Sequence, residues 1–207
     1  MYELTDKKLA QLKKQIDRLF NRYRATISFD ELNVINVIPK TRELYSELEA
    51  LNDKVSLEIA NYYYQEAMKD KEKKLSTQWL ADILLGYDFI TRYVYKHEVE
   101  RKQARLAESL MSSKTKLDNF KTARNLWWRQ TYQYAINITD EALLKAYKDL
   151  GYKYVMWNTV MDGRECKICR ERNRKIYPIE NARKQHYNCR CYWTPVKKVV
   201  TKWKMLS

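Results

Sequence analysis

The N-terminal part of the chain repeats apolar side chains every three or four residues, the spacing of one face of an α-helix. The first such segment runs from Thr5 to about Arg24, and its apolar positions are Leu9, Leu12, Ile16, Leu19, Phe20 and Tyr23. Similar stripes over residues 39–68, 76–86, 88–111 and 114–137 predict further helices. The pattern therefore predicts a mainly α-helical protein with a long-helix N-terminal body.

Local signals place the ends of these helices. Ser28 and Glu31 have the spacing of a capping box, so a short helix should follow them. It should end at Ile38, because the residue before a proline disfavours the α region, and Pro39 should then begin the next helix. The charged run at residues 69–74 predicts a solvated turn, and most tyrosines and tryptophans share the spacing of the leucines, which favours core packing over base stacking.

The pattern changes near residue 139. Thr139 has the character of an N-cap, and the helix that it starts should end at Gly151, a suitable left-handed residue. The aromatic and β-branched run at residues 152–160 then predicts a strand. We therefore expect two units: a helical body at residues 1–138 that makes protein–protein contacts, and a small α+β module at residues 139–207.

Positive charge is concentrated in the second unit. The whole chain has a net charge of +14, and from Arg164 to the C-terminus 13 lysines and arginines face 3 glutamates. Lysine and arginine that neutralise phosphates release counterions, so this module should bind double-stranded DNA or an acidic partner; the alternative is a solubilising end. The candidate contact residues are Arg174, Lys175, Arg190, Lys197 and Lys198.

No apolar run approaches the roughly 18 residues of a membrane span, and the N-terminus has no apolar signal region. The chain should therefore stay in the cytoplasm where it is made and have no membrane partner. Thiols remain reduced there, so clustered cysteines bind a metal more often than they form disulfides.

All four cysteines lie close together in the sequence, in the pairs Cys166/Cys169 and Cys189/Cys191. The first pair can direct two thiolates to one tetrahedral ion, and the second can do so if it is extended, since residues two apart share a face. Arg190 would then point to the opposite face. Five candidates exist for four places: either the four cysteines complete the shell, or His186 replaces one of them. The alternatives to a metal are buried free thiols or two disulfides.

A closed shell of four ligands has no open position for water, so the predicted ion is a structural zinc. Such an ion would stabilise a module too small to bury a large core. No phosphate loop, zinc-protease motif or carboxylate pair is recognisable, and the one catalytic alternative is a nucleophilic Cys166 or Cys189 with His186 as base. We therefore expect no enzymatic activity.

The segment from residue 157 to residue 195 resembles the C-terminal signature of phage head morphogenesis proteins, the family named after the F protein of phage Mu. The elements that carry the resemblance are Trp157, Asp162, Arg164, Cys166, Cys169, His186, Cys189, Arg190, Cys191 and Pro195. Two turns depart from the family pattern: Asn173-Arg174 stands where a glycine is common, and residues 183–185 replace the usual prolines. These departures concern loop geometry more than the metal ligands.

The resemblance implies a minor head protein of a tailed bacteriophage, built into the procapsid at low copy near the portal vertex. Its implied partners are the portal protein, the major capsid or scaffolding protein, and the packaged DNA. Asp162 and Arg164 should orient the turn before the first cysteine pair, and Arg190 should contact a partner or pair with Asp162. The rival hypothesis is a zinc-stabilised DNA-binding regulatory protein without a role in the virion.

Overall fold

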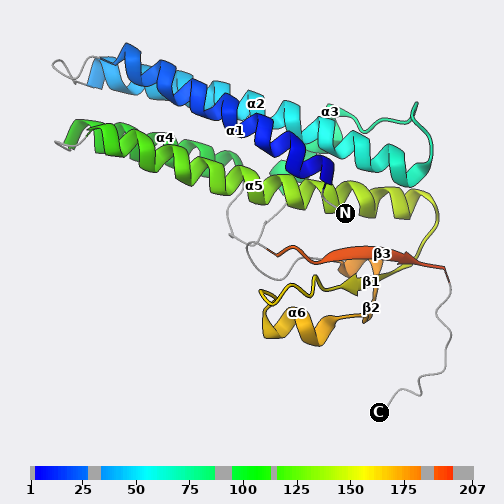
Figure 1. Cartoon of the computed structure of the whole chain (residues 1–207). Coiled ribbons are helices and arrows are strands. Elements are labelled where there is room, and N and C mark those ends of the chain that lie inside the picture. Colours follow the sequence, from blue (N-terminus) through cyan, green and yellow to red (C-terminus); the bar gives the residue numbers. More distant parts are fainter. Residues whose placement is uncertain (1–2, 28–33, 87–94, 113–115, 183–188, 198–207) are drawn as a thin grey trace.

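The computed structural model describes residues 3–27, 34–86, 95–112, 116–182 and 189–197 (Figure 1). A mainly α-helical body precedes a small antiparallel sheet, as the sequence predicts. The elements in chain order are α1 (Glu3–Thr26), α2 (Val34–Met68), α3 (Thr77–Gly86), α4 (Tyr95–Ser112), α5 (Lys116–Asp149), β1 (Tyr154–Asn158), α6 (Lys167–Arg172), β2 (Ile176–Pro178), the 3-10 turn η1 (Ile179–Asn181) and β3 (Tyr192–Val196).

The body is a bundle in which α2 packs against α1, α4 and α5. The predicted stripe of α1 is buried in it, since Leu9, Leu12 and Ile16 are each no more than 2% exposed. Tyr45 of α2 lies edge-on to Phe20 of α1 and Trp127 of α5, which confirms that aromatic side chains build this core. None of the helices that the structure describes is long and apolar enough to cross a membrane.

The expected helix end at Ile38 is wrong, because α2 continues through Pro39. The side chains of Val37, Thr41 and Leu44 follow at helical spacing and are all completely buried. Packing of this face outweighs the local cost of one missing N–H, and the Thr41 hydroxyl donates to the carbonyl oxygens of Val37 and Ile38 at 3.0 Å each. The predicted capping box at residues 28–31 lies outside the described residues.

The expected new helix at Thr139 is also wrong, since α5 is continuous from Lys116 to Asp149. Thr139 is completely buried, and its hydroxyl donates to the carbonyl oxygen of Ala135 and lies 2.9 Å from the Thr5 hydroxyl. A break here would disturb the burial of Ile138 and Ala142, which are both 0% exposed. The predicted division at residue 138 therefore falls inside one unbroken helix.

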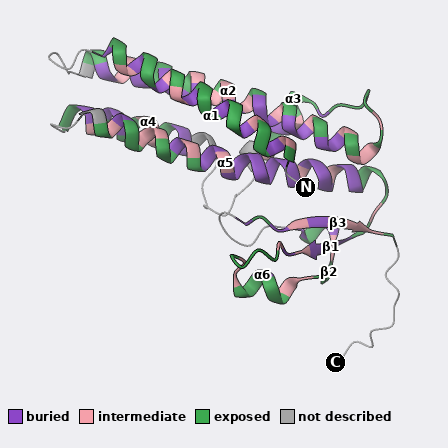
Figure 2. Cartoon of the chain, in the orientation of Figure 1, coloured by how far each residue is buried: buried purple, intermediate pink, exposed green. Residues whose placement is uncertain are grey.

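The C-terminal half of α5 is buried around nearly its whole circumference (Figure 2). The bundle helices α1, α2 and α4 contact this helix, and β3 contacts it too. A helix buried on all sides is typical of the centre of a protein rather than its surface. Helix α5 is therefore the element that joins the body to the sheet.

The end of α5 confirms the predicted role of Gly151. This residue has φ of +81°, and the amides of Gly151 and Tyr152 donate to the carbonyl oxygens of Lys148 and Tyr147. These two bonds form a Schellman motif, and the rings of Tyr147 and Tyr152 supply its apolar contact at 6.2 Å. The motif turns the chain out of the helix and into β1.

The sheet has the strand order β2-β1-β3, with both pairings antiparallel. Val155, Trp157 and Trp193 alternate inward and are no more than 1% exposed. Trp157 and Trp193 are direct partners in the register, and their rings meet edge-to-face at 4.8 Å. These aromatic side chains of the sheet belong to the same hydrophobic cluster as the core of the bundle.

Candidate metal centre

The antiparallel pairing of β1 with β3 brings the two cysteine pairs together. Asn158 at the end of β1 lies opposite Tyr192 at the start of β3, so the chain that leaves β1 runs beside the chain that enters β3. The first segment leads to Cys166 and Cys169 at the start of α6, and the second contains Cys189 and Cys191. Residues twenty positions apart in the sequence therefore meet at one end of the sheet.

The sulfur atoms of Cys169, Cys189 and Cys191 all lie within 4.8 Å of one another. All three side chains are buried, and the Cys169 and Cys189 sulfurs are 3.7 Å apart. Two sulfurs that share a tetrahedral zinc with bonds of about 2.3 Å are about 3.8 Å apart. This group of three cysteines could hold a metal ion.

Cys166 lies beside this group. Its sulfur caps α6 by accepting a hydrogen bond from the Cys169 amide at 3.4 Å, and it lines the same pocket of about 300 Å³ as the other three cysteines. His186, the other predicted ligand, lies outside the described residues.

The pKa values of the buried thiols differ from one another. Burial raises the pKa of Cys169 to about 12, whereas hydrogen bonding from Cys189 lowers the pKa of Cys191 to about 5. A hydrogen bond from the backbone of Val160 also stabilises the Cys191 thiolate. A buried cluster that holds negative charge on sulfur has the electrostatic character of a cation site.

Thr159 connects the aromatic core to the cysteines, a role that sequence reasoning missed. Its hydroxyl accepts a hydrogen bond from the Trp157 indole at 3.1 Å and donates to the Cys169 carbonyl oxygen at 2.6 Å. Its amide donates to the side chain of Asn173 at 3.0 Å. Thr159 is a positioning residue, and no sequence motif distinguishes it from any other threonine at the end of a strand.

Arg172 covers the aromatic core from the side of α6, and it too was missed. Its guanidinium lies 5.0 Å from the ring of Trp157 and 4.7 Å from the ring of Tyr177, and it donates to the Tyr177 hydroxyl at 3.0 Å. Arginine stacks on aromatic faces through its planar charge. This contact fixes the end of the helix that carries Cys169.

Asp162 ties the two cysteine loops together. Its carboxylate accepts a hydrogen bond from the Arg164 amide at 3.1 Å and lies 3.5 Å from the Arg164 side chain. The same carboxylate pairs with Arg190 at 3.2 Å. Arg190 is exposed between the buried Cys189 and Cys191, and together with Asp162 it lines the pocket that the four cysteines share.

The other predicted contact residues are spread over the module. Arg174, Lys175 and Lys197 are exposed, with the first two in the turn before β2 and the third after β3. Arg174 has φ of +62°, the conformation that a glycine would adopt most easily in that turn. Lys198 lies outside the described residues.

Comparisons with family models, curated proteins and solved structures find no match for this chain. Its function has to be argued from its own residues.

Proposed function

We propose that the C-terminal module binds one structural zinc ion through Cys166, Cys169, Cys189 and Cys191. The spacing of 3.7 Å between the Cys169 and Cys189 sulfurs supports it, because this is the separation of two sulfurs on a tetrahedral zinc. Cys166 lies on the wall of the same pocket and supplies the fourth thiolate. Four protein ligands exclude water from the ion, so the site is structural and the module is not an enzyme.

The metal content of the purified full chain tests this proposal. Wild-type protein should carry one equivalent of zinc, and Cys169→Ser and Cys166→Ser should lose it. Lys167→Ser changes an exposed neighbour on α6 and should retain the metal. His186→Ala decides the fourth ligand, because zinc retained in this variant but lost in Cys166→Ser assigns the position to cysteine. Wild-type protein without zinc, and without a response to chelator, would overturn the proposal.

We propose further that the protein is a minor head protein of a tailed bacteriophage, present at low copy near the portal vertex. The supporting observation is that both halves of the motif resembling head morphogenesis proteins converge: the Cys166 and Cys189 segments share one pocket, and Asp162 pairs with Arg190 across it. The helical body would contact the portal, capsid or scaffolding protein. The module would present a rigid basic surface to DNA.

Quantitative mass spectrometry of particles from a phage that encodes this chain tests the head role. We expect the protein in procapsids and mature heads at a copy number close to that of the portal or below it, far under that of the major capsid protein. A phage-encoded replication protein serves as the negative control for carry-over. Complete absence from both particles would overturn the proposal.

The exposed positions of Arg174, Lys175 and Lys197 favour one alternative, a zinc-stabilised DNA-binding regulatory protein. Such a protein would bind duplex DNA with an affinity that falls steeply as salt rises. Arg174→Gln and Lys175→Gln should each then reduce the salt dependence by about one phosphate contact. Absence from particles together with this DNA binding would favour the regulator.

A further inference from the structure

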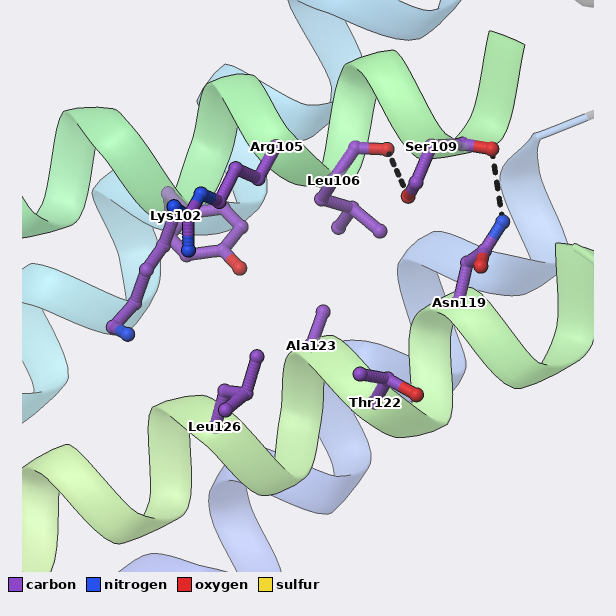
Figure 3. A pocket seen from close by; sticks show the side chains of 9 residues that line it. Lys102, Arg105, Leu106, Ser109, Asn119, Thr122, Ala123 and Leu126 are labelled. Atoms are coloured by element: carbon purple, nitrogen blue, oxygen red, sulfur yellow. Dashed lines mark hydrogen bonds between the residues drawn. The ribbon is translucent and has the colours of Figure 1, made fainter. Parts of the chain in front are cut away.

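A second site lies in the helical body, away from the cysteines. A groove of about 190 Å³ runs between α4 and α5, with Leu106, Ala123 and Leu126 as its apolar walls. Figure 3 shows Leu106 on one helix facing Ala123 and Leu126 on the other across an open space. An apolar cavity of about 150 Å³ takes up a benzene molecule, so this groove has room for one aromatic ring.

Tyr45 of α2 lines the same groove. The side chain is 2% exposed, and its aromatic neighbours Phe20 and Trp127 hold its ring edge-on from two sides. Burial raises the pKa of its hydroxyl. The Tyr45 ring is therefore a fixed aromatic part of the lining of the groove.

The rim of the groove is positively charged. Lys102 and Arg105 lie on its wall, and the charges of Arg101 and Arg129 act on Lys102 as well. Glu98 balances part of this charge, since it pairs with Arg101 at 2.8 Å and lies 3.9 Å from Lys102. Arg105 is exposed, and the structure shows no ion pair for it within the described residues. The rim therefore has an excess of positive charge that suits more than one carboxylate.

We propose that this groove is the docking site for an acidic segment of a partner protein, which inserts one aromatic side chain between α4 and α5. The ring would occupy the apolar space, and flanking carboxylates would lie against Lys102 and Arg105. Leu126 is 42% exposed at the edge, which leaves apolar surface outside the cavity for the rest of the segment. Deeply seated aromatic anchors surrounded by a polar rim are the usual energetic centres of protein interfaces.

The direct test is binding of the full-length protein to a fluorescent peptide with one phenylalanine flanked on each side by two glutamates. Binding should be lost when the peptide's phenylalanine is replaced by alanine, and it should weaken when its glutamates become glutamines. Equal binding of the alanine peptide would overturn the proposal, because the contact would then be purely electrostatic. Free 3-phenylpropionate tests the other source of this chemistry: if it binds and the peptide does not, the site is not a docking site for protein.

Two variants of the protein locate the contact. Ala123→Trp fills the groove and should weaken binding at least tenfold, whereas Ala104→Trp, the same change at an exposed position of α4, should leave it unchanged. Arg105→Gln should weaken binding about two- to fivefold, as for an exposed ion pair, and Arg18→Gln on α1 is its control. Because Arg105 is exposed, Arg105→Gln should fold normally and can be tested even if Ala123→Trp fails to fold. Wild-type affinity in both groove variants would overturn the proposal, whatever the zinc content or particle location proves to be.

Discussion

The helical body and the C-terminal module bury different kinds of side chain. The body fills its core with leucine, isoleucine and tyrosine from four long helices that contact one another. In the module, the buried side chains are Cys169, Cys189 and Cys191 together with Val155, Trp157 and Trp193. A thiol buries much less apolar surface than leucine does, so buried cysteines alone stabilise the module less than leucines stabilise the body. Substitutions and metal removal that affect one region at a time should show whether the two regions differ in what stabilises them.

Removal of the proposed zinc ion should cause the largest loss of stability, and this loss should be confined to the module. Structural zinc in small peptides contributes about 10–16 kcal/mol, which is comparable to the entire stability of a typical domain. A strong chelator should therefore shift the indole N–H resonances of Trp157 and Trp193 towards unfolded positions, while that of Trp127 in the bundle stays in place. Helical circular dichroism should remain nearly unchanged. Simultaneous loss of both regions would contradict the comparison, because the two would then unfold as one unit.

Truncation of one buried tryptophan in each region should cause the second largest loss of stability. Trp127→Ala and Trp193→Ala each remove a side chain that is 1% exposed, at a cost of about 3–5 kcal/mol. The larger core of the body should survive this loss with a lower urea midpoint, whereas Trp193→Ala should also weaken zinc retention. Trp128→Ala, at a half-buried position on α5, is the control with a smaller expected effect. Equal zinc affinity in the wild type and Trp193→Ala would show that the metal site does not depend on the aromatic core.

Removal of the Thr159 hydroxyl should cost less. Thr159→Val keeps the shape of the side chain but leaves the Trp157 indole and the Cys169 carbonyl without their partner, at about 1–3 kcal/mol. Competition with a colorimetric chelator should then show faster zinc release from this variant. Thr159→Ser restores the hydroxyl and should recover most of the wild-type behaviour; a serine variant as weak as the valine variant would assign the effect to packing instead.

The smallest predicted change in stability concerns Asp53 in the body, and here the substitution should stabilise the protein. Burial, assisted by the charge of Glu49, raises the pKa of Asp53 to about 6, so the folded state binds a proton that the unfolded chain releases near pH 4. Its charged form destabilises the fold above pH 6, and this penalty disappears as the pH falls below about 4. Asp53→Asn should raise the free energy of unfolding at pH 7 by about 1 kcal/mol, a discounted value because the carboxylate is partly exposed. Urea titrations of the wild type and Asp53→Asn at pH 7 and pH 4 measure this difference.

The sequence predicted the kind of fold better than the limits of its helices. Apolar spacing identified α1 and α3, and the φ of Gly151 agrees with its expected place after a helix. Pro39 and Thr139 were misleading for one reason: both have strong local preferences for a helix boundary, and both lie where neighbouring residues are completely buried. Tertiary packing decided both cases, and no local signal reports it.

The cysteine cluster was predictable in composition and only partly in geometry. Spacing alone indicated that two cysteine pairs could share an ion, and Cys169, Cys189 and Cys191 do lie together. The contribution of Thr159 and Arg172 could not be foreseen, because it depends on the register of β1 with β3 and on where α6 packs. Hydrogen bonds between residues ten positions apart have no signature in a single sequence.

The unbroken course of α5 also has a mechanical consequence. Its 34 residues form a rod of about 50 Å that begins within the bundle and ends a few residues before β1. The Schellman turn at Gly151 leads from this rod to β1, and β3 contacts the rod directly, so the sheet is attached to α5 both through the chain and through packing. A displacement of the sheet would therefore reach the bundle through α5.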